Sequence, residues 1–277
     1  MRDDTCASCH AVPVPIEVVA HRGANEEEPE HSLAAYLKAL DGGADAVECD
    51  VRLTADGVLV LVHDRRIDRT SSGRGTVAAK PLAELSKHDF SGGAGKWLDF
   101  EAPTLDETRS RVLTLDAFLS ALLERSDTVR FAIETKHPTR FGAYVEATLV
   151  ETLERFGLVL PRRNGASRVR MMSFSQVAVR RMRGMAPTIP TVLLMDRVPM
   201  RFRDGSLPLG VSIAGPSIEI IRAHPGYVGR VHALGGQVHV WTVDDPADVD
   251  LCIDLGVDAI ISNRPSMVRA RLDKRDA

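Results

Sequence analysis

The chain has 277 residues, of which 44% are apolar and 26% are charged, so it can bury a core of domain size. Its formal net charge of −3 and its pI near 6.3 exclude the broad basic field with which nucleic-acid binders neutralise phosphates. No apolar run approaches the roughly 18 residues that cross a bilayer, and residues 1–4 lead into no apolar signal segment, so we expect a cytoplasmic protein with no transmembrane segment and no nucleic-acid partner.

The first residues contain a short cysteine motif. Cys6 to His10 read Cys-Ala-Ser-Cys-His, the C-x-x-C-H pattern of covalent haem attachment. Such attachment goes with export, which the N-terminus does not support, so a labile metal site or an incidental pair in a loose arm is the preferred interpretation. Four cysteines are too few and too unevenly placed for a disulfide framework. We predict a flexible arm over residues 1–15, a single domain over residues 16–277, and core positions for Cys49 and Cys252.

Apolar runs of strand length alternate with amphipathic stretches of helical length, which predicts repeated βα units around a parallel sheet. Eight strand regions are expected: Glu17–Ala20, Ala46–Val51 with the adjoining Val58–Val62, Phe131–Glu134, Val169–Ser173, Thr191–Met195, Gly210–Ile213, Val238–Thr242 and Ala259–Ile261. The expected helices are Ser32–Asp41, Leu82–Lys87, Leu115–Glu124, Ala143–Phe156, Gln176–Met185, Glu219–Gly235 with a break at Pro225, Pro246–Leu255 and Ser266–Lys274.

An eight-stranded (β/α)8 TIM barrel is the economical arrangement, because such a barrel needs about 250 residues and no linker divides the chain. The turn Thr54–Gly57 suits a tight hairpin within the second strand region. Residues 64–114 are polar and glycine-rich, and we expect an extended insertion over the barrel mouth. A doubly wound open sheet is the alternative, weakened because no Gly-x-Gly-x-x-Gly follows the first strand.

Carboxylates gather at the predicted C-terminal ends of early strands, the rim where barrel enzymes build active sites. Glu48 and Asp50 are two residues apart, so on a strand they point to the same face. Glu134, on the next strand region, would complete a three-carboxylate oxygen site suited to Mg²⁺ or Ca²⁺. Zinc fits poorly, because it prefers nitrogen and sulfur ligands.

Two histidines share this rim with the carboxylates. His21 and His63 could divide the proton transfers of phosphodiester cleavage, one taking a proton from the nucleophile and the other protonating the leaving alkoxide. Arg22 and Lys136 add cationic donors for the charge of the transition state. A single histidine at a strand end is more often structural, but the joint pattern on three strand regions favours a functional site.

The same residues lie in longer motifs that resemble the glycerophosphodiester phosphodiesterases. The matching segments are His21-Arg22-Gly23, Pro29–Tyr36, Gly43–Val51, Thr54–Gly57, His63-Asp64, Ile67–Thr70, Ile133–Lys136, Val240–Asp244 and Gly256–Pro265. The resemblance therefore runs from about Val18 to about Pro265, nearly the whole chain.

The resemblance implies hydrolysis of glycerophosphodiesters to sn-glycerol 3-phosphate and an alcohol, with a divalent cation. By motif position it assigns metal binding to Glu48, Asp50 and Glu134. It assigns acid–base chemistry to His21 and His63, and substrate contacts to Arg22, Lys136 and Trp241. Glu30 and Phe174 are further candidates. The head group, the choice of Mg²⁺ or Ca²⁺, a cyclic-phosphate or direct-water route and a homodimer stay open.

Two positions depart from the family pattern. His31 stands where the family usually has Asn, and we expect it to cap or orient the first helix. Asn263 stands where the family usually has Asp, and we expect it to alter only a turn. The acidic run Glu26–Glu28 beside the mouth suggests discrimination against anionic head groups.

Three other functions are weighed against this hypothesis. A lysophospholipase D activity on the same barrel would need an exposed apolar lip for an acyl chain, which the polar segment 64–114 does not offer. A non-catalytic phosphate-binding barrel would lack the acid–base pair, yet His21 and His63 are both present. A haem protein would reveal itself by visible absorption. A phosphodiesterase acting on small glycerophosphodiesters is the favoured hypothesis.

Overall fold

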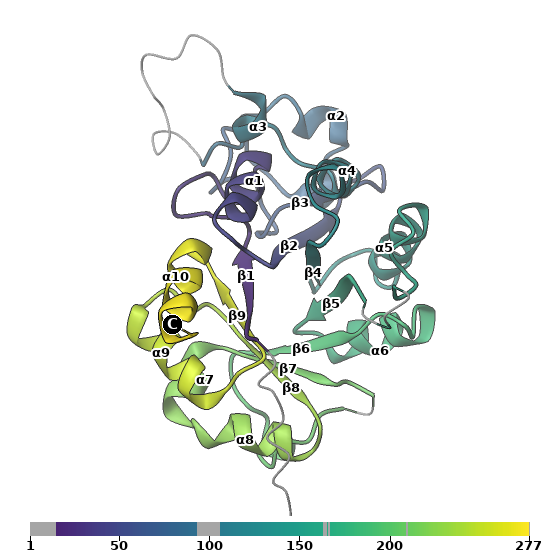
Figure 1. The fold of residues 1–277 in the computed structure, drawn as a ribbon. Helices are drawn as coiled ribbons and strands as arrows, with labels where there is room; N and C mark the ends of the chain where they lie inside the picture. Colours follow the sequence, from purple (N-terminus) through teal and green to yellow (C-terminus); the bar gives the residue numbers. More distant parts are fainter. Residues whose placement is uncertain (1–14, 93–105, 163–164, 166, 209, 277) are drawn as a thin grey trace, which may run out of the picture.

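Eight parallel strands close into a barrel, with helices outside it, in the computed structural model (Figure 1). It describes residues 15–276 except 93–105, 163–164, 166 and 209. β1 pairs with both β2 and β9, which closes the ring and confirms the (β/α)8 prediction. The barrel strands are β1 (Glu17–His21), β2 (Ala46–Leu53), β4 (Arg130–Thr135), β5 (Val169–Ser173), β6 (Thr191–Met195), β7 (Ile213–Pro216), β8 (Gln237–Val240) and β9 (Ala259–Ser262).

The helices follow the amphipathic stretches of the sequence. They are α1 (Leu33–Asp41), α2 (Leu82–Leu85), α3 (Glu107–Ser110), α4 (Leu115–Arg125), α5 (Tyr144–Arg155), α6 (Gln176–Met185), α7 (Ile218–Ala223), α8 (Gly226–Ala233), α9 (Pro246–Leu255) and α10 (Pro265–Asp276). The side chain of Ser32 caps α1 by accepting a hydrogen bond from the Ala35 amide. Gly256 ends α9 in the left-handed conformation. The break expected at Pro225 separates α7 from α8.

Apolar side chains fill the middle of the barrel interior and close it below the mouth. This layer comes from alternate positions of the strands, and it comprises Val19, Ala46, Ala132, Met172, Val192, Leu194, Ile213, Ala259 and Ile261. A larger apolar cluster lies between the strands and the helices. Because side chains alternate along a strand, those two positions beyond Val19 and Ala46, namely His21 and Glu48, emerge above the layer. His21 and Glu48 are also partners in the β1–β2 register.

The insertion after β2 is more ordered than an extended polar loop. The expected hairpin is present: β3 (Leu59–Leu61) pairs antiparallel with β2. The short helical segments η1 (Val77–Ala79), α2 and α3 follow it. An apolar cluster of its own stabilises the segment, because scattered apolar residues converge there: Val60, Val62, Ile67, Val77, Leu85, Phe90 and Val112. The short helix expected near Leu82–Lys87 is present as α2, and the described part of the insertion also has an apolar cluster that the sequence analysis did not predict.

The sixth barrel strand, β7, lies three residues later than predicted, at Ile213–Pro216 instead of Gly210–Ile213. Gly215 and Pro216 resemble a turn in sequence, and their low strand propensity hid the strand. The barrel needs a small residue here: a Cβ at Gly215 would lie 2.8 Å from Leu194 Cδ2 and 2.9 Å from Val192 Cγ1. Close packing against β6 thus overrides local propensity.

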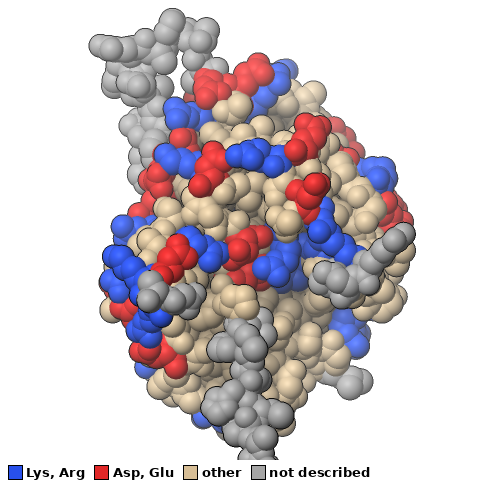
Figure 2. Space-filling model, viewed as in Figure 1, with Lys and Arg blue, Asp and Glu red and all other residues tan. Residues whose placement is uncertain are grey.

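The remaining sequence predictions concern cysteines, charge and membranes. Cys49 and Cys252 are buried with free thiols, as expected, whereas Cys6 to His10 lie outside the described residues. Figure 2 shows Lys and Arg interspersed with Asp and Glu over the visible face. Within the described part of the chain, no helix has the length and apolar character required to cross a bilayer. A further short 3-10 helix, η2 (Met200–Phe202), follows β6.

Candidate active site

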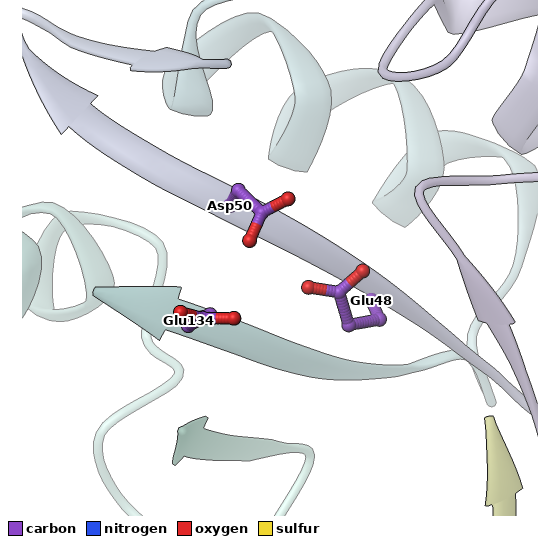
Figure 3. Close-up of side chains that lie close together, drawn as sticks. All are labelled: Glu48, Asp50 and Glu134. Carbon is purple, nitrogen blue, oxygen red and sulfur yellow. The ribbon is translucent and has the colours of Figure 1, made fainter. Parts of the chain in front are cut away.

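Three carboxylates meet above the apolar layer of the barrel. Glu48 and Asp50 project from β2 and Glu134 from the adjacent β4 (Figure 3). One oxygen from each lies within 4.8 Å of the others, and all three side chains are buried. Burial and the charge of Asp50 raise the pKa of Glu134 to about 8 and raise that of Glu48 as well. Such mutual repulsion between oxygen ligands is relieved by a bound cation, so the cluster fits a hard divalent ion.

Cationic side chains surround Asp50. Lys136 Nζ lies 3.2 Å from Asp50 Oδ1 and 2.8 Å from Glu134 Oε1. Arg22 Nε lies 3.1 Å from Asp50 Oδ2. Burial alone would raise the pKa of Asp50, but a hydrogen bond from His31 and the charge of Lys136 hold it well below its usual range. Asp50 therefore stays ionised, and its negative charge holds the side chains of Arg22 and Lys136 in place.

The segment after β1 is folded tightly against the carboxylates. Arg22 has φ 57° and His31 φ 61°, both in the left-handed region that non-glycine residues seldom adopt. The His31 amide donates to the Arg22 carbonyl at 3.1 Å, and the Arg22 amide donates to Glu48 Oε2 at 3.0 Å. Gly23 also has positive φ, and a Cβ there would lie 2.6 Å from Ala35 Cβ. The His-Arg-Gly motif is thus required by geometry as well as by chemistry.

His31 supports the carboxylates from behind. Its Nε2 lies 2.9 Å from Asp50 Oδ2, and its Nδ1 lies 2.8 Å from the Tyr36 hydroxyl. That hydroxyl donates to the Glu48 carbonyl at 3.1 Å. The sequence analysis expected His31 to cap or orient the first helix: Ser32 is the cap, whereas His31 contacts α1 through Tyr36. The signal that could have identified its role is its departure from the family's usual residue beside Glu30.

His21 is oriented by a chain of hydrogen bonds that begins at Asn263, just after the neighbouring strand β9. Its Nδ1 lies 2.7 Å from Asn263 Oδ1, and Asn263 Nδ2 donates to Asp244 Oδ2 at 2.6 Å. Because Asp244 and the Asn25 amide fix which way the Asn263 amide points, Nδ1 of His21 carries the proton and Nε2 is the acceptor. The sequence analysis expected Asn263 to alter only a turn, but the structure shows that it also orients the ring of His21. Burial, then Arg22, lowers the pKa of His21 to about 3.

His63 is held by an ionic cluster at the rim. Its Nδ1 lies 2.7 Å from Asp64 Oδ1, and Arg69 donates to Asp64 and to both carboxylate oxygens of Glu30. Burial would raise the pKa of Asp64, but the hydrogen bonds from Arg69 and His63 lower it to about 2. Asp64 therefore faces His63 as a carboxylate. Burial, together with the charges of Arg22 and Lys136, lowers the pKa of His63, and the charge of Asp50 and the hydrogen bond to Asp64 oppose that shift only in part.

A pocket of about 100 Å³ joins these groups. Eight of the predicted residues line it: His21, Arg22, Glu48, His63, Glu134, Lys136, Phe174 and Trp241. Phe174 and Trp241 form its aromatic wall, with ring centroids 5.3 Å apart in an edge-on contact, and Trp241 Nε1 donates to the Gly215 carbonyl at 2.7 Å. The structure thus brings the predicted residues together around one cavity. Asp50 lies behind it and Glu30 lies at the rim, bound to Arg69 and 3.3 Å from Arg22.

The acidic run beside the mouth does not present a free negative surface. Glu26 pairs with Arg264 at 3.2 Å and Glu27 with Lys38 at 2.9 Å. Glu28 is buried and pairs with Arg109 at 2.8 Å. Each carboxylate thus has a cationic partner, and the discrimination against anionic head groups expected from the sequence stays a prediction.

Histidines, oxygen ligands and cations around one pocket at the C-terminal end of a (β/α)8 barrel define an enzyme suited to an anionic substrate. The sequence profile of the Glycerophosphoryl diester phosphodiesterase family matches residues 21–267. The chain belongs to this family of phosphodiesterases.

Individual relatives cover nearly the whole chain. A protein of Mycobacterium tuberculosis (strain ATCC 25618 / H37Rv) named "Probable glycerophosphodiester phosphodiesterase 1" is 44% identical over 92% of each chain. The glycerophosphodiester phosphodiesterase of Bacillus subtilis (strain 168) is 30% identical over 92% of this chain and 86% of its own. The crystal structure of the Agrobacterium tumefaciens enzyme has a TM-score of 0.72 at 29% identity and covers 92% of this chain and 99% of that one.

A further structure shares the fold at lower sequence identity. It is a phosphodiesterase of Oleispira antarctica, solved with the product sn-glycerol-3-phosphate, with a TM-score of 0.78 at 24% identity. It covers 93% of this chain and 96% of that one. The two proteins therefore share the barrel fold.

Proposed function

We propose that this chain hydrolyses glycerophosphodiesters to sn-glycerol 3-phosphate and an alcohol, in lipid and glycerol metabolism. The observation that carries the proposal is the single pocket that joins two histidines, two carboxylates and two cations. Family membership supports the substrate class, and the product bound to the Oleispira antarctica enzyme supports the product. The single domain over residues 16–277 and the cytoplasmic location belong to this proposal as well.

Glu48, Asp50 and Glu134 would hold the divalent cation. Their oxygens lie close enough to share one ion, and burial together with the charge of Asp50 raises the pKa of Glu48 and Glu134, a cost that a cation would offset. When bound, the cation supplies Lewis-acid neutralisation of the phosphate oxygens. Mg²⁺ and Ca²⁺ both accept an all-oxygen ligand set, and additional ligands would come from substrate or water.

The two histidines have environments that suit opposite roles. Burial, then the charge of Arg22, disfavours the protonated form of His21, and Nδ1 faces the neutral amide of Asn263. The free Nε2 therefore suits a general base acting on the nucleophile. Burial lowers the pKa of His63 too, but its hydrogen bond to the Asp64 carboxylate opposes that shift, so of the two histidines it is the better suited to be the general acid that protonates the leaving alcohol. Arg22 and Lys136 would bind the phosphate and stabilise its negative charge.

Replacing Asn263 by Asp is expected to move the acid limb of kcat/KM to higher pH. A carboxylate beside Nδ1 would stabilise the imidazolium of His21 and raise its pKa, so the base would stay protonated, and inactive, up to a higher pH. The expected shift is roughly one to two pH units. The measurement is the pH profile of kcat/KM for the native chain and for Asn263→Asp. An acid limb that stays in place would contradict the assignment of His21 as the base.

Turnover of defined substrates tests the proposed function. Release of sn-glycerol 3-phosphate would be measured from glycerophosphocholine, glycerophosphoethanolamine and glycerophosphoglycerol, with and without chelator. Long-chain lysophosphatidylcholine serves as the comparison that distinguishes a lysophospholipase D. Chelator-sensitive turnover of the small diesters supports the proposal. A purified, folded chain that releases no glycerol phosphate from any of them would disprove it.

A further inference from the structure

A second hollow of about 400 Å³, which we name the basic groove, opens beside the catalytic pocket. It lies at the C-terminal ends of β2 and β4, and its polar lining comprises Arg52, Arg65, Thr76, Lys136, Thr139 and Arg140. Lys136 lines the groove and the catalytic pocket alike, so the two hollows are adjacent. The groove has about four times the volume of the catalytic pocket. The catalytic pocket alone is too small to hold a bulky diester.

Positive charge in the basic groove is not neutralised by its own lining, since no Asp or Glu is among the described residues that form it. Arg65 and Arg140 are exposed, and neither forms an ion pair with any residue that the structure describes. The guanidinium of Arg140 rests on the ring of Phe141, 4.8 Å from its centroid. Free arginines of this kind offer planar pairs of donors to phosphate or carboxylate groups.

The walls of the basic groove are fixed by hydrogen bonds. On one wall, the Val77 amide donates to the Arg65 carbonyl at 3.1 Å, which joins η1 to the segment that follows β3. The opposite wall is anchored where His137 Nε2 lies 2.6 Å from Glu146 Oε1 on α5. A groove with both walls anchored binds a ligand at a lower entropic cost than a flexible surface does.

The basic groove also borders the residue that we assign as the proton donor. Arg52 donates to the His63 carbonyl through Nε at 3.0 Å and Nη2 at 2.7 Å. In the proposed reaction His63 protonates the leaving alcohol, so that alcohol must lie on the His63 side of the phosphate. The aromatic wall of Phe174 and Trp241 lies in the smaller pocket, which is left for the glycerol portion.

We infer that the basic groove holds the alcohol portion of the diester and selects alcohols that carry a further negative charge, such as a second phosphate. This inference rests on the proposed function. Arg65 and Arg140 are specificity residues in this view, because they contact the distant charge and not the reacting phosphate. An alcohol with a quaternary ammonium group gains nothing from them and is repelled by like charge.

The test compares two substrates and three variants. The substrates are glycerophosphocholine and glycerophosphoglycerol extended by one further glycerol phosphate unit. The native chain is compared with Arg65→Gln, Arg140→Gln and the double variant. Arg66→Gln is the matched control, because Arg66 neighbours Arg65 in sequence and is exposed, but pairs with Asp68 and does not line the groove.

The measured quantity is the ratio of kcat/KM for the extended substrate to kcat/KM for glycerophosphocholine. The native chain is expected to favour the extended substrate, and the double variant is expected to lower the ratio roughly fivefold to tenfold, as two solvent-exposed charge pairs would. Arg66→Gln is expected to keep the native ratio. A double variant whose ratio stays within about twofold of the native value overturns the inference while the proposed function stands. Absence of turnover with both substrates overturns the function itself.

Discussion

Replacing His63 by Ala is expected to lower kcat by about two to four orders of magnitude, the usual contribution of a positioned general acid. His63 lies beside Asp64, whose carboxylate stabilises the protonated ring, and its backbone carbonyl is held by Arg52. Without the ring, the alkoxide leaves unprotonated. Because the proton is needed only as the bond breaks, the loss should appear in kcat and not in KM. Steady-state kinetics on glycerophosphocholine measure both constants.

The matched control for this substitution is His224→Ala. His224 is exposed at the end of α7, on the outer surface of the barrel, and takes no part in the pocket. It should leave both kinetic constants close to the native values, and circular dichroism should show that both variants are folded. A His63→Ala chain that retains more than about a tenth of native kcat would remove His63 from the proposed acid–base pair.

Residues on strand ends were predictable from sequence because the spacing of a strand fixes their direction. Glu48 and Asp50 are two apart and had to share a face, and the parallel alternation brought Glu134 to the neighbouring strand. The hairpin at Gly57 was predictable for a similar reason: the glycine has φ +80°, which the Asp-Gly turn signal anticipates. Local geometry therefore gave most of the barrel and its reactive groups.

Contacts between distant segments were not predictable in the same way. Asn263 meets His21 only because β9 closes against β1, 242 positions away along the chain. His31 reaches Asp50 because two left-handed residues fold the segment back on itself. Neither contact leaves a periodic pattern. At each of these two positions the sequence departs from the residue usual in the family. That departure indicates altered support for the site but does not give its geometry.

Packing also hid two structural features from sequence analysis. The strand at Ile213–Pro216 includes Gly215, whose missing side chain makes room for Val192 and Leu194. The insertion contains few apolar residues per segment, yet they converge into one cluster that orders it. That ordering positions Arg65 and Thr76, and hence one wall of the basic groove. A tertiary cluster built from scattered residues has no signature in a local window.

Replacing Glu134 by Gln is expected to lower activity by roughly three orders of magnitude and to abolish stabilisation by Mg²⁺ or Ca²⁺. The substitution removes one of three charged ligands and leaves the shape of the side chain unchanged. In the native chain a cation at a hundredfold excess over its Kd should raise Tm by roughly 5 to 10 °C, because it binds only the folded state. Thermal denaturation with added Mg²⁺, added Ca²⁺ or chelator measures this effect independently of turnover.

Without a cation the sign of the stability change reverses. Burial and Asp50 raise the pKa of Glu134 to about 8, so its negative charge is unfavourable when no cation is bound. The neutral amide of Gln therefore should keep or raise the Tm measured in chelator, even though activity is lost. Glu219→Gln, an exposed change on α7, is the control and should respond to the cation like the native chain. A Glu134→Gln chain that still gains the full cation-dependent rise in Tm would show that the ion is bound elsewhere.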